Sequence, residues 1–261
     1  MNTATAGTRH LPIMPANFSP LVRLGIGSIG LAALVALAAW VVHFTGDARR
    51  FPLNEVEVLG TLDYTDRDEL RELVVRQTRN GFYRLNIDEI RRDVTRLPWV
   101  AEAHIRRVWP DRLSIDVVEH EPSARWNDDA LISKKFEMFF PPQLAEDSVQ
   151  RAEWLAFFSR FPQLEGSFGR HEAVLSNYRT MQVYLQPFGV GIDALSEDDR
   201  RSQTLLLSNN VSVRLGMVDL EERMQRFVSI YQRLVEPLEG RAANFDMRYT
   251  NGFAMSRNEM L

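Results

Sequence analysis

The uncharged run over residues 24–44 constrains this chain more than any other feature of its sequence. It contains no Asp, Glu, Lys or Arg. At a rise of about 1.5 Å per residue, a helix of this length matches the ~30 Å hydrocarbon core of a bilayer. A buried core helix would carry one polar face, and a cleaved signal peptide would have a shorter apolar core that ends in a small-x-small site. Ala36 and Ala38 form such a pattern weakly, but the apolar run continues to Phe44. The sequence therefore predicts an uncleaved transmembrane helix over residues 24–44.

The residues that flank this run bear on its orientation. Arg9 and Arg23 precede it, and Arg49 and Arg50 follow it, so the positive-inside rule gives a tie. The free amino terminus favours the cytoplasmic side for the segment before the run. We therefore predict a cytoplasmic tail over residues 1–23, a single membrane pass, and a C-terminal body on the far side.

The body after the run is mildly acidic and has no cysteine. The whole chain has a formal net charge of −4, and no acidic residue precedes Asp47. An acidic body argues against nucleic acid as a partner. The lack of cysteine excludes disulfide bonds and a thiol nucleophile. These features leave open protein binding, and catalysis by other groups.

The sequence of the body lacks the common catalytic and metal-binding patterns. There is no G-x-S-x-G, no H-E-x-x-H, no phosphate-binding loop and no S-x-x-K. His120 lies between Glu119 and Glu121, but neighbours on a strand face opposite sides, and no third ligand stands at a useful spacing. We therefore expect solvated sheet residues here, and neither an enzyme nor a metal, cofactor or small-molecule site.

The first half of the body has the pattern of a β-α-α-β-β unit. Residues 53–59 alternate apolar and acidic side chains, which is typical of a short strand. Thr65 and Asn86 each precede acidic residues and an apolar stripe at helical spacing, so we predict that they cap two helices. Two further strands are predicted on either side of a turn at Trp109-Pro110. This order predicts two helices packed on a small sheet.

The second half of the body also mixes helices with strands, in an α+β pattern. We predict a short strand or a hairpin over residues 130–140 and then a helix that ends near Phe161. The aromatic stripe of this helix could contact a lipid, a partner or the core, and we favour core packing. A helix over residues 173–185 precedes an antiparallel meander, and Asp219 with Glu222 forms a predicted capping box for the last helix.

The C-terminal residues predict a final hairpin. Side chains alternate over residues 244–249, Asn251-Gly252 is a turn signal, and Phe253 begins a last strand. A last strand often lies at a sheet edge, where its N–H and C=O groups can bind a further strand. From the residues alone, a plain terminal hairpin is the simpler interpretation.

Several segments of the chain resemble one family. The motifs W-P-D-R-L at 109–113, E-H-E-P at 119–122 and F-P-Q-L-E-G at 161–166 follow an anchor and a β-α-α-β-β pattern. In motif and layout the chain is similar to the FtsQ/DivIB family of bacterial cell-division proteins. The resemblance implies a POTRA (polypeptide transport-associated) domain over residues 51–120 and the α+β module that the family calls its β domain over residues 121–261.

The resemblance also implies a periplasmic binding site for other proteins of the divisome, the cell-division machinery. In the family, the β domain binds the C-terminal segment of FtsB, itself coiled with FtsL, by strand addition at its C-terminal edge. The family's R-Y-x-S-G segment, its paired arginines and the last strand give the candidate partner-binding residues: Arg200, Arg201, Arg248, Tyr249, Thr250, Asn251, Gly252, Phe253 and Met255. Two departures from the family, Asn251 for serine and Gln203 for tryptophan, are expected to alter fine contacts rather than the binding mode.

The function that the resemblance implies is that of a non-enzymatic scaffold in the inner membrane at the division septum. It would hold FtsB and FtsL in the periplasm and link them to septal peptidoglycan synthesis. Two alternatives stay open. A POTRA unit could belong to a periplasmic adaptor or chaperone for outer-membrane proteins or secretion, and a cell-wall hydrolase would release muropeptides.

Overall fold

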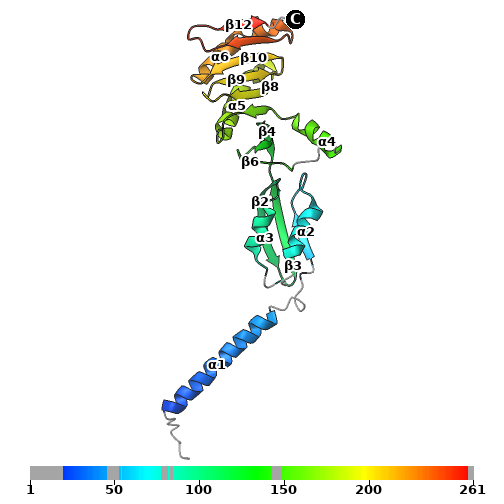
Figure 1. Ribbon diagram of the computed structural model, residues 1–261, viewed down its shortest axis with the longest axis vertical. Coiled ribbons are helices and arrows are strands. Elements are labelled where there is room, and N and C mark those ends of the chain that lie inside the picture. The colour runs from blue at the N-terminus through cyan, green and yellow to red at the C-terminus, as the bar shows by residue number, and fades with distance from the viewer. Residues whose placement is uncertain are drawn as a thin grey trace, which may run out of the picture.

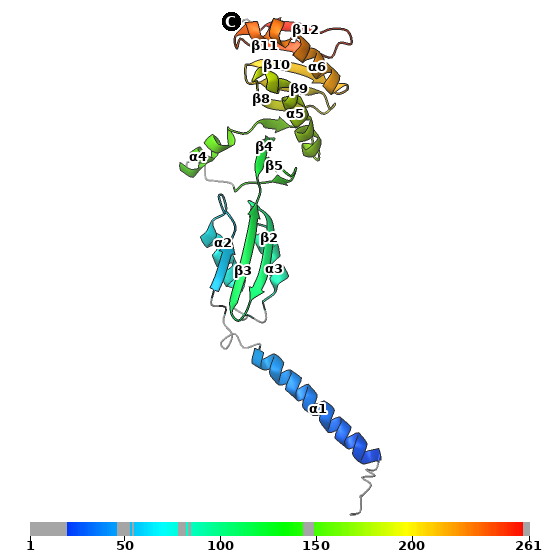
Figure 2. The same cartoon turned by 180° about the vertical axis from the view of Figure 1, so that it is seen from behind.

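The structure is a computed structural model that describes residues 20–45, 53, 55–77, 82, 85–142 and 149–257. Helix α1, Pro20–Thr45, is followed by two α+β units, the first over residues 55–119 and the second over residues 122–257 (Figure 1, Figure 2). Most of the predicted tail lies outside the described residues. Within the described ranges, no helix is both long enough and apolar enough to be assigned as a membrane span.

The first unit confirms the predicted β-α-α-β-β order. Its elements are β1 Glu55–Leu59, α2 Arg67–Gln77, α3 Ile87–Val94, β2 Val100–Val108 and β3 Arg112–Glu119. The strands form a sheet in the order β1-β3-β2, in which β1 and β3 are parallel and β2 and β3 are antiparallel. Apolar residues of both helices pack on one sheet face, with Leu70 and Ile90 fully buried against Leu113 and Ile115.

One of the two predicted caps in this unit is correct. The Asn86 side chain accepts a hydrogen bond from the backbone N–H of Glu89, as expected of a cap. The prediction of Thr65 as the other cap is wrong, because its hydroxyl is buried and has no hydrogen-bond partner. Asp66 takes that place, since its carboxylate accepts from the N–H of Asp68 at 2.8 Å.

The second unit holds a sheet of nine strands and three α-helices within the described residues. Its elements are β4 Pro122–Trp126, β5 Ala130–Ser133, β6 Met138–Phe139, α4 Val149–Phe158, β7 Gln163–Glu165, α5 His171–Leu185, η3 Gln186–Phe188, β8 Ile192–Glu197, β9 Gln203–Leu207, β10 Val211–Gly216, α6 Leu220–Ile230, η4 Tyr231–Val235, η5 Glu236–Leu238, β11 Ala243–Asp246 and β12 Ala254–Arg257. The predicted hairpin over 130–140 is present as β5 and β6. The helix predicted before Phe161 is present as α4.

The sheet of the second unit is mixed, which corrects the predicted antiparallel sheet. Its order is β12-β11-β10-β9-β8-β7-β4-β5-β6, and the meander β8-β9-β10 is antiparallel as predicted. However, β7 runs parallel to β8 and to β4, and β10 runs parallel to β11. The reason is that α5 connects β7 to β8, α6 connects β10 to β11, and the segment with β5, β6 and α4 connects β4 to β7, and such crossovers join parallel neighbours.

Helices α5 and α6 cover one face of this sheet and leave the other face open (Figure 1, Figure 2). The covered face carries the apolar core, in which Leu205, Val213 and Phe245 pack against Phe227 of α6. On β10 the side chains alternate, so Val213 is buried and Arg214 is exposed. The open face therefore presents polar side chains next to the C-terminal edge.

The capping box predicted for α6 is wrong. Asp219 does precede the helix, but its φ is +52° and its side chain makes no capping hydrogen bond. A capping residue normally has an extended backbone that aims its side chain at the first turn. The left-handed conformation of Asp219 turns the side chain away from that position.

Candidate partner-binding edge and interdomain joint

Strand β12 lies at one end of the nine-stranded sheet. It pairs in antiparallel register with β11 over Ala243–Asp246, and no described strand pairs with its other side. The prediction that the last strand forms a sheet edge is confirmed for the described residues. Such an edge presents backbone donors and acceptors to any strand that can align with it.

The backbone of β11 fixes which groups of β12 are free to bind. The N–H of Met247 donates to the carbonyl of Arg214 at 2.9 Å, so the backbone N–H and C=O groups of Met247 point toward β10. Successive residues of a strand direct these groups to opposite sides. Phe245 therefore also faces β10, whereas Asn244 and Asp246 face β12.

The register then divides the residues of β12 into two sets. Ala254 and Ser256 stand opposite the two β11 residues that face β12, so their N–H and C=O groups complete the internal ladder. Met255 and Arg257 direct their N–H and C=O groups outward, toward the open edge. An added strand would hydrogen-bond to these two residues.

The side chains near this edge differ between the two faces of the sheet. Phe253 and Met255 are half-buried and extend the core, with the Phe253 ring 6.0 Å from that of Phe245. Ala254 and Ser256 are exposed on the open face. There they line a hollow of about 400 Å³ together with residues of β10 and β11. A bound strand would thus find apolar contacts on one side and a polar hollow on the other.

The segment between β11 and β12 is a longer loop than the sequence predicted. Strand β11 ends at Asp246, so Tyr249 lies outside the strand, and the turn lies at Thr250-Asn251, one residue before the predicted Asn251-Gly252. Arg226 of α6 holds the loop, because its guanidinium donates to the carbonyls of Tyr249 at 2.6 Å and Thr250 at 2.9 Å. Tyr249 keeps 58% of its surface exposed.

Arg226 is a residue that the sequence reasoning missed. It contacts a loop that lies 23 or more positions further along the chain. No periodicity or motif links two such positions, so only a folded structure brings them together.

Arg248 is held by a neighbouring carboxylate. Its guanidinium pairs with Asp246 through Nε to Oδ1 at 2.9 Å and Nη2 to Oδ2 at 2.7 Å. The hydrogen bond from Arg248 lowers the pKa of Asp246, and the pair raises the pKa of Arg248. An acidic group of a partner would therefore meet an arginine whose direction is already fixed.

The predicted arginine pair lies on the turn between β8 and β9. Asp198 organises this turn, since its carboxylate accepts from the N–H of Arg200 at 2.9 Å and of Ser202 at 2.8 Å. Arg201 has a φ of +61° and its N–H donates to the Asp198 carbonyl. Both arginines are exposed. A hollow of about 430 Å³ brings this turn, through Asp198, beside Arg248.

Gln203 faces the interior of the domain. It is 1% exposed, and its amide donates to Glu197 at 2.9 Å. Glu197 in turn accepts two hydrogen bonds from Arg170, at 2.8 Å and 3.1 Å. Gln203, the departure from the family's tryptophan, therefore supports the arginine-bearing turn from inside the domain.

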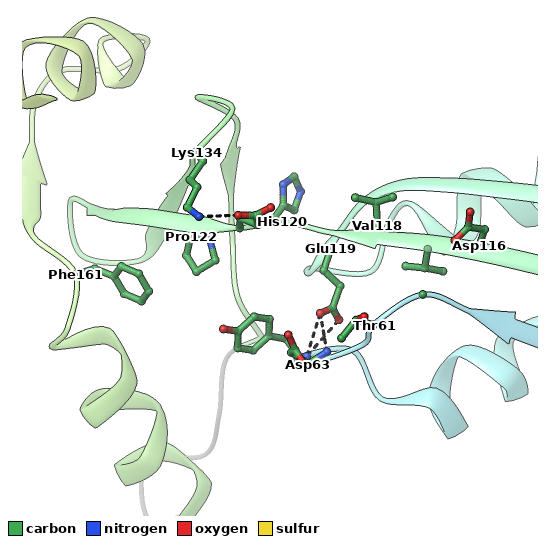
Figure 3. A pocket seen from close by; sticks show the side chains of 13 residues that line it. Thr61, Asp63, Asp116, Val118, Glu119, His120, Pro122, Lys134 and Phe161 are labelled. Atoms are coloured by element: carbon green, nitrogen blue, oxygen red, sulfur yellow. Dashed lines mark hydrogen bonds and ion pairs between the residues drawn. The ribbon is translucent and has the colours of Figure 1, made fainter.

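The two units meet at a joint that contains a hollow of about 610 Å³ (Figure 3). Glu119 lines this hollow, and its carboxylate accepts hydrogen bonds from the backbone N–H groups of Asp63, Tyr64 and Thr65 at 2.6 to 3.2 Å. The prediction that Glu119 and His120 are simply solvated is therefore wrong. His120 has a side chain only 12% exposed, and its ring stacks on Phe139 at 4.4 Å.

An aromatic cluster fills the joint beside this hollow. Trp99, 2% exposed, stacks on Tyr64 at 4.4 Å and on Trp154 of α4 at 5.2 Å, and meets Phe139 of β6 edge-on at 5.2 Å. Phe157 of α4 also contacts Tyr64. The aromatic stripe of α4 thus packs in a core, as predicted, but this core joins the two units.

Acidification should loosen this joint through His120. Burial lowers the pKa of His120, while Glu137, with its carboxylate 3.3 Å from the ring, opposes that effect and Lys135 adds to it. Because the folded pKa lies below the unfolded one, the stabilisation is present above about pH 6.5 and is lost as the pH falls below it. Hydrogen exchange of β3 and β6 between pH 7.5 and 5 measures the loss. A His120→Gln variant should show a smaller pH dependence, and an equal one would contradict the assignment.

Each of the two units matches the model of a known protein family. Residues 51–120 match the family model of the POTRA domain, FtsQ-type, and residues 124–248 match that of the cell division protein FtsQ/DivIB, C-terminal. The edge strand β12 lies beyond the second match. The described residues contain no group of three acidic or histidine side chains that could hold a metal ion.

Relatives of similar length carry the same family description. The chain is 32% identical over 234 residues to the cell division protein FtsQ of Xanthomonas campestris pv. campestris, covering 90% of this chain and 78% of that protein. It is 30% identical over 227 residues to FtsQ of Coxiella burnetii, covering 87% and 88%. It is 31% identical over 228 residues to FtsQ of Escherichia coli, covering 85% and 79%. The chain therefore belongs to the FtsQ/DivIB family of cell division proteins.

Proposed function

We propose that this chain is a membrane-anchored scaffold of the divisome that binds FtsB, coiled with FtsL, along the open edge of β12. The observation that carries the proposal is the outward direction of the Met255 and Arg257 backbone groups. Binding by strand addition uses such groups for affinity and the flanking side chains for register. The function is binding, without turnover, and needs neither a cofactor nor nucleic acid.

The candidate residues divide into three roles under this proposal. The outward backbone of Met255 supplies ladder bonds, and the half-buried Phe253 supplies apolar contact. The loop over residues 249–252, held by Arg226, places Tyr249 beside the incoming strand. Arg200, Arg201 and Arg248 offer positive charge to acidic residues of the partner, which sets orientation and association rate more than affinity.

The proposed anchor is α1, with the tail cytoplasmic and both α+β units in the periplasm. The uncharged run over residues 24–44 supports this placement. Apolar side chains of α1 such as Leu31, Leu34 and Leu37 are 60 to 66% exposed, and a lipid environment would cover them. The joined units would then carry the edge of β12 away from the bilayer, toward the septal peptidoglycan synthesis machinery.

Met255→Pro should weaken the binding of an FtsB C-terminal peptide about tenfold or more. Proline removes the outward N–H without breaking a bond of the internal ladder, and it is tolerated on edge strands. Loss of one such hydrogen bond and the clash of the ring together cost on the order of 1–3 kcal/mol. The measurement is titration calorimetry with the full chain in nanodiscs.

Two variants control this experiment. Met255→Ala removes the side chain but keeps the N–H, so it should bind more tightly than Met255→Pro. Ser256→Pro breaks the internal ladder and should also raise hydrogen exchange in β11. If Met255→Pro binds as well as Met255→Ala, the edge of β12 is not the binding site. If membranes yield outer-membrane protein precursors and no FtsB on capture, the adaptor alternative replaces this proposal.

A further inference from the structure

The turn between β2 and β3 presents a large aromatic side chain at one end of the POTRA domain. Trp109 is 61% exposed. Its indole packs edge-on against the buried ring of Phe82, with centroids 5.4 Å apart. The next residue, Pro110, is exposed as well. Most of the indole surface therefore faces outward.

Three arginines lie on the strands that flank the turn, two on β2 and one on β3. Arg106 and Arg112 are exposed, and Arg107 is anchored by a hydrogen bond to the Leu85 carbonyl. Among the described residues, the Arg112 guanidinium has no ion-pair partner. The nearby acids are Asp111 on the turn and Glu55 and Glu57 on β1, which stand beside Arg112 and Ser114 in the sheet register, so side chains of both charges lie at this end.

The position of the turn relative to α1 is limited by the chain. Strand β1 enters the domain at Glu55, which pairs in register with Arg112 beside the turn. Nine residues lie between Thr45, the end of α1, and Glu55, so ten steps along the chain join the two. Ten such steps span at most about 35 Å when the chain is fully extended. If α1 spans the bilayer, the turn stands within that distance of the membrane surface.

We propose that the turn over residues 109–112, with Arg106, is a membrane-contact site. Trp109 lies among the phospholipid headgroups, where an amphipathic indole is favoured, and Arg106 and Arg112 bind lipid phosphates. The occupant is the phospholipid surface of the periplasmic leaflet. This inference rests on the proposed anchoring by α1. Its consequence is that the POTRA domain contacts the bilayer at a second place besides α1, which fixes the orientation of the domain relative to the membrane.

The absence of cysteine allows a direct test. Asp111→Cys is labelled with an environment-sensitive fluorophore in the full chain, which is placed in nanodiscs of phosphatidylethanolamine and phosphatidylglycerol that contain a headgroup nitroxide lipid. A second chain carries the label at Phe168→Cys, a position in the other unit that is 96% exposed. We expect at least twofold stronger quenching at position 111 than at position 168.

Substitutions in the labelled chain separate the contributions. Trp109→Ala should reduce quenching at position 111 to the level at position 168. Arg112→Glu should reduce it as well, whereas Arg71→Glu, the same charge reversal at an exposed site on α2, should leave it unchanged. Equal quenching at positions 111 and 168 in the unsubstituted chain would overturn the inference, as would quenching that needs a second protein.

The test distinguishes this inference from the function on which it rests. A chain that does not float with lipid vesicles refutes the anchoring itself. A chain that floats and binds the FtsB peptide, but shows no quenching at position 111, refutes only the membrane-contact site.

Discussion

Replacing Trp99 with alanine should release the two α+β units to move against each other. Trp99 is buried between Tyr64 of the first unit and Phe139 of the second, and Trp154 of α4 stacks on it. Truncation of a buried tryptophan typically costs about 3–5 kcal/mol, because the cavity left behind is not filled. Here the lost stability is that of the contact between the units, because Trp99 lies in the cluster at the joint and each unit has a separate core.

Distances between spin labels measure this release. Labels at Glu72→Cys on α2 and Val183→Cys on α5 report on the two units, and both positions are exposed. The wild-type background should give one narrow distance distribution and Trp99→Ala a broad one. Exposed ion pairs at the joint, such as Lys135 with Glu102, contribute too little to hold it alone.

A second buried tryptophan provides the matched control. Trp126, 4% exposed, belongs to the core of the second unit only. Trp126→Ala should therefore destabilise that unit without broadening the distance between units. If Trp99→Ala leaves the distribution narrow, the aromatic cluster is not what joins the units, and the contacts of Glu119 become the main candidate.

The sequence predicted those parts of the fold that depend on local pattern. Alternation of apolar and polar side chains identified the meander β8-β9-β10, and Asn86 was recognised as a cap because the signal lies within four residues. The parallel pairing of β10 with β11 could not be derived this way. It follows from α6 crossing the sheet between them, a relation between segments that alternation does not encode.

The same limit applies to the candidate site, where only the features that depend on local pattern were predicted. The position of β12 at the sheet edge follows from its being the last strand of a hairpin. The loop before it was misjudged, because Asn251-Gly252 favours a tight turn, whereas Arg226 holds the carbonyls of Tyr249 and Thr250 in a wider one. Likewise, His120 looked exposed from strand alternation, but Phe139 from a later hairpin covers its ring.

Arg170→Ala should destabilise the second unit by about 3 kcal/mol at neutral pH. Glu197 has a side chain only 2% exposed and accepts two hydrogen bonds from Arg170, which is 30% exposed. Removal of one partner of a buried ion pair leaves the other charge without compensation, which costs about 3–5 kcal/mol when both are buried. The partial exposure of Arg170 places the estimate at the low end. Gln203 alone would then support the Glu197 carboxylate.

The pH dependence of the stability that Arg170→Ala loses, called here the deficit, identifies the cause of the loss. In the wild type, the hydrogen bond from Arg170 lowers the pKa of Glu197. The pair therefore stabilises the fold above the unfolded pKa, about 4.3, and this contribution is lost as the pH falls through the folded value. Without Arg170, burial should instead raise the pKa of Glu197. Protonation then relieves the buried charge, so the deficit of the variant should shrink between pH 7 and pH 4.

A double variant separates the buried charge from the lost side chain. Arg170→Ala with Glu197→Gln has no buried carboxylate and should recover part of the stability at pH 7, as measured by hydrogen exchange of β8 and β9. Because Glu197 adjoins the turn that carries Arg200 and Arg201, Arg170→Ala should also weaken binding of the FtsB peptide. A deficit that is constant with pH, and unchanged in the double variant, would show that Arg170 stabilises the unit by packing rather than by charge.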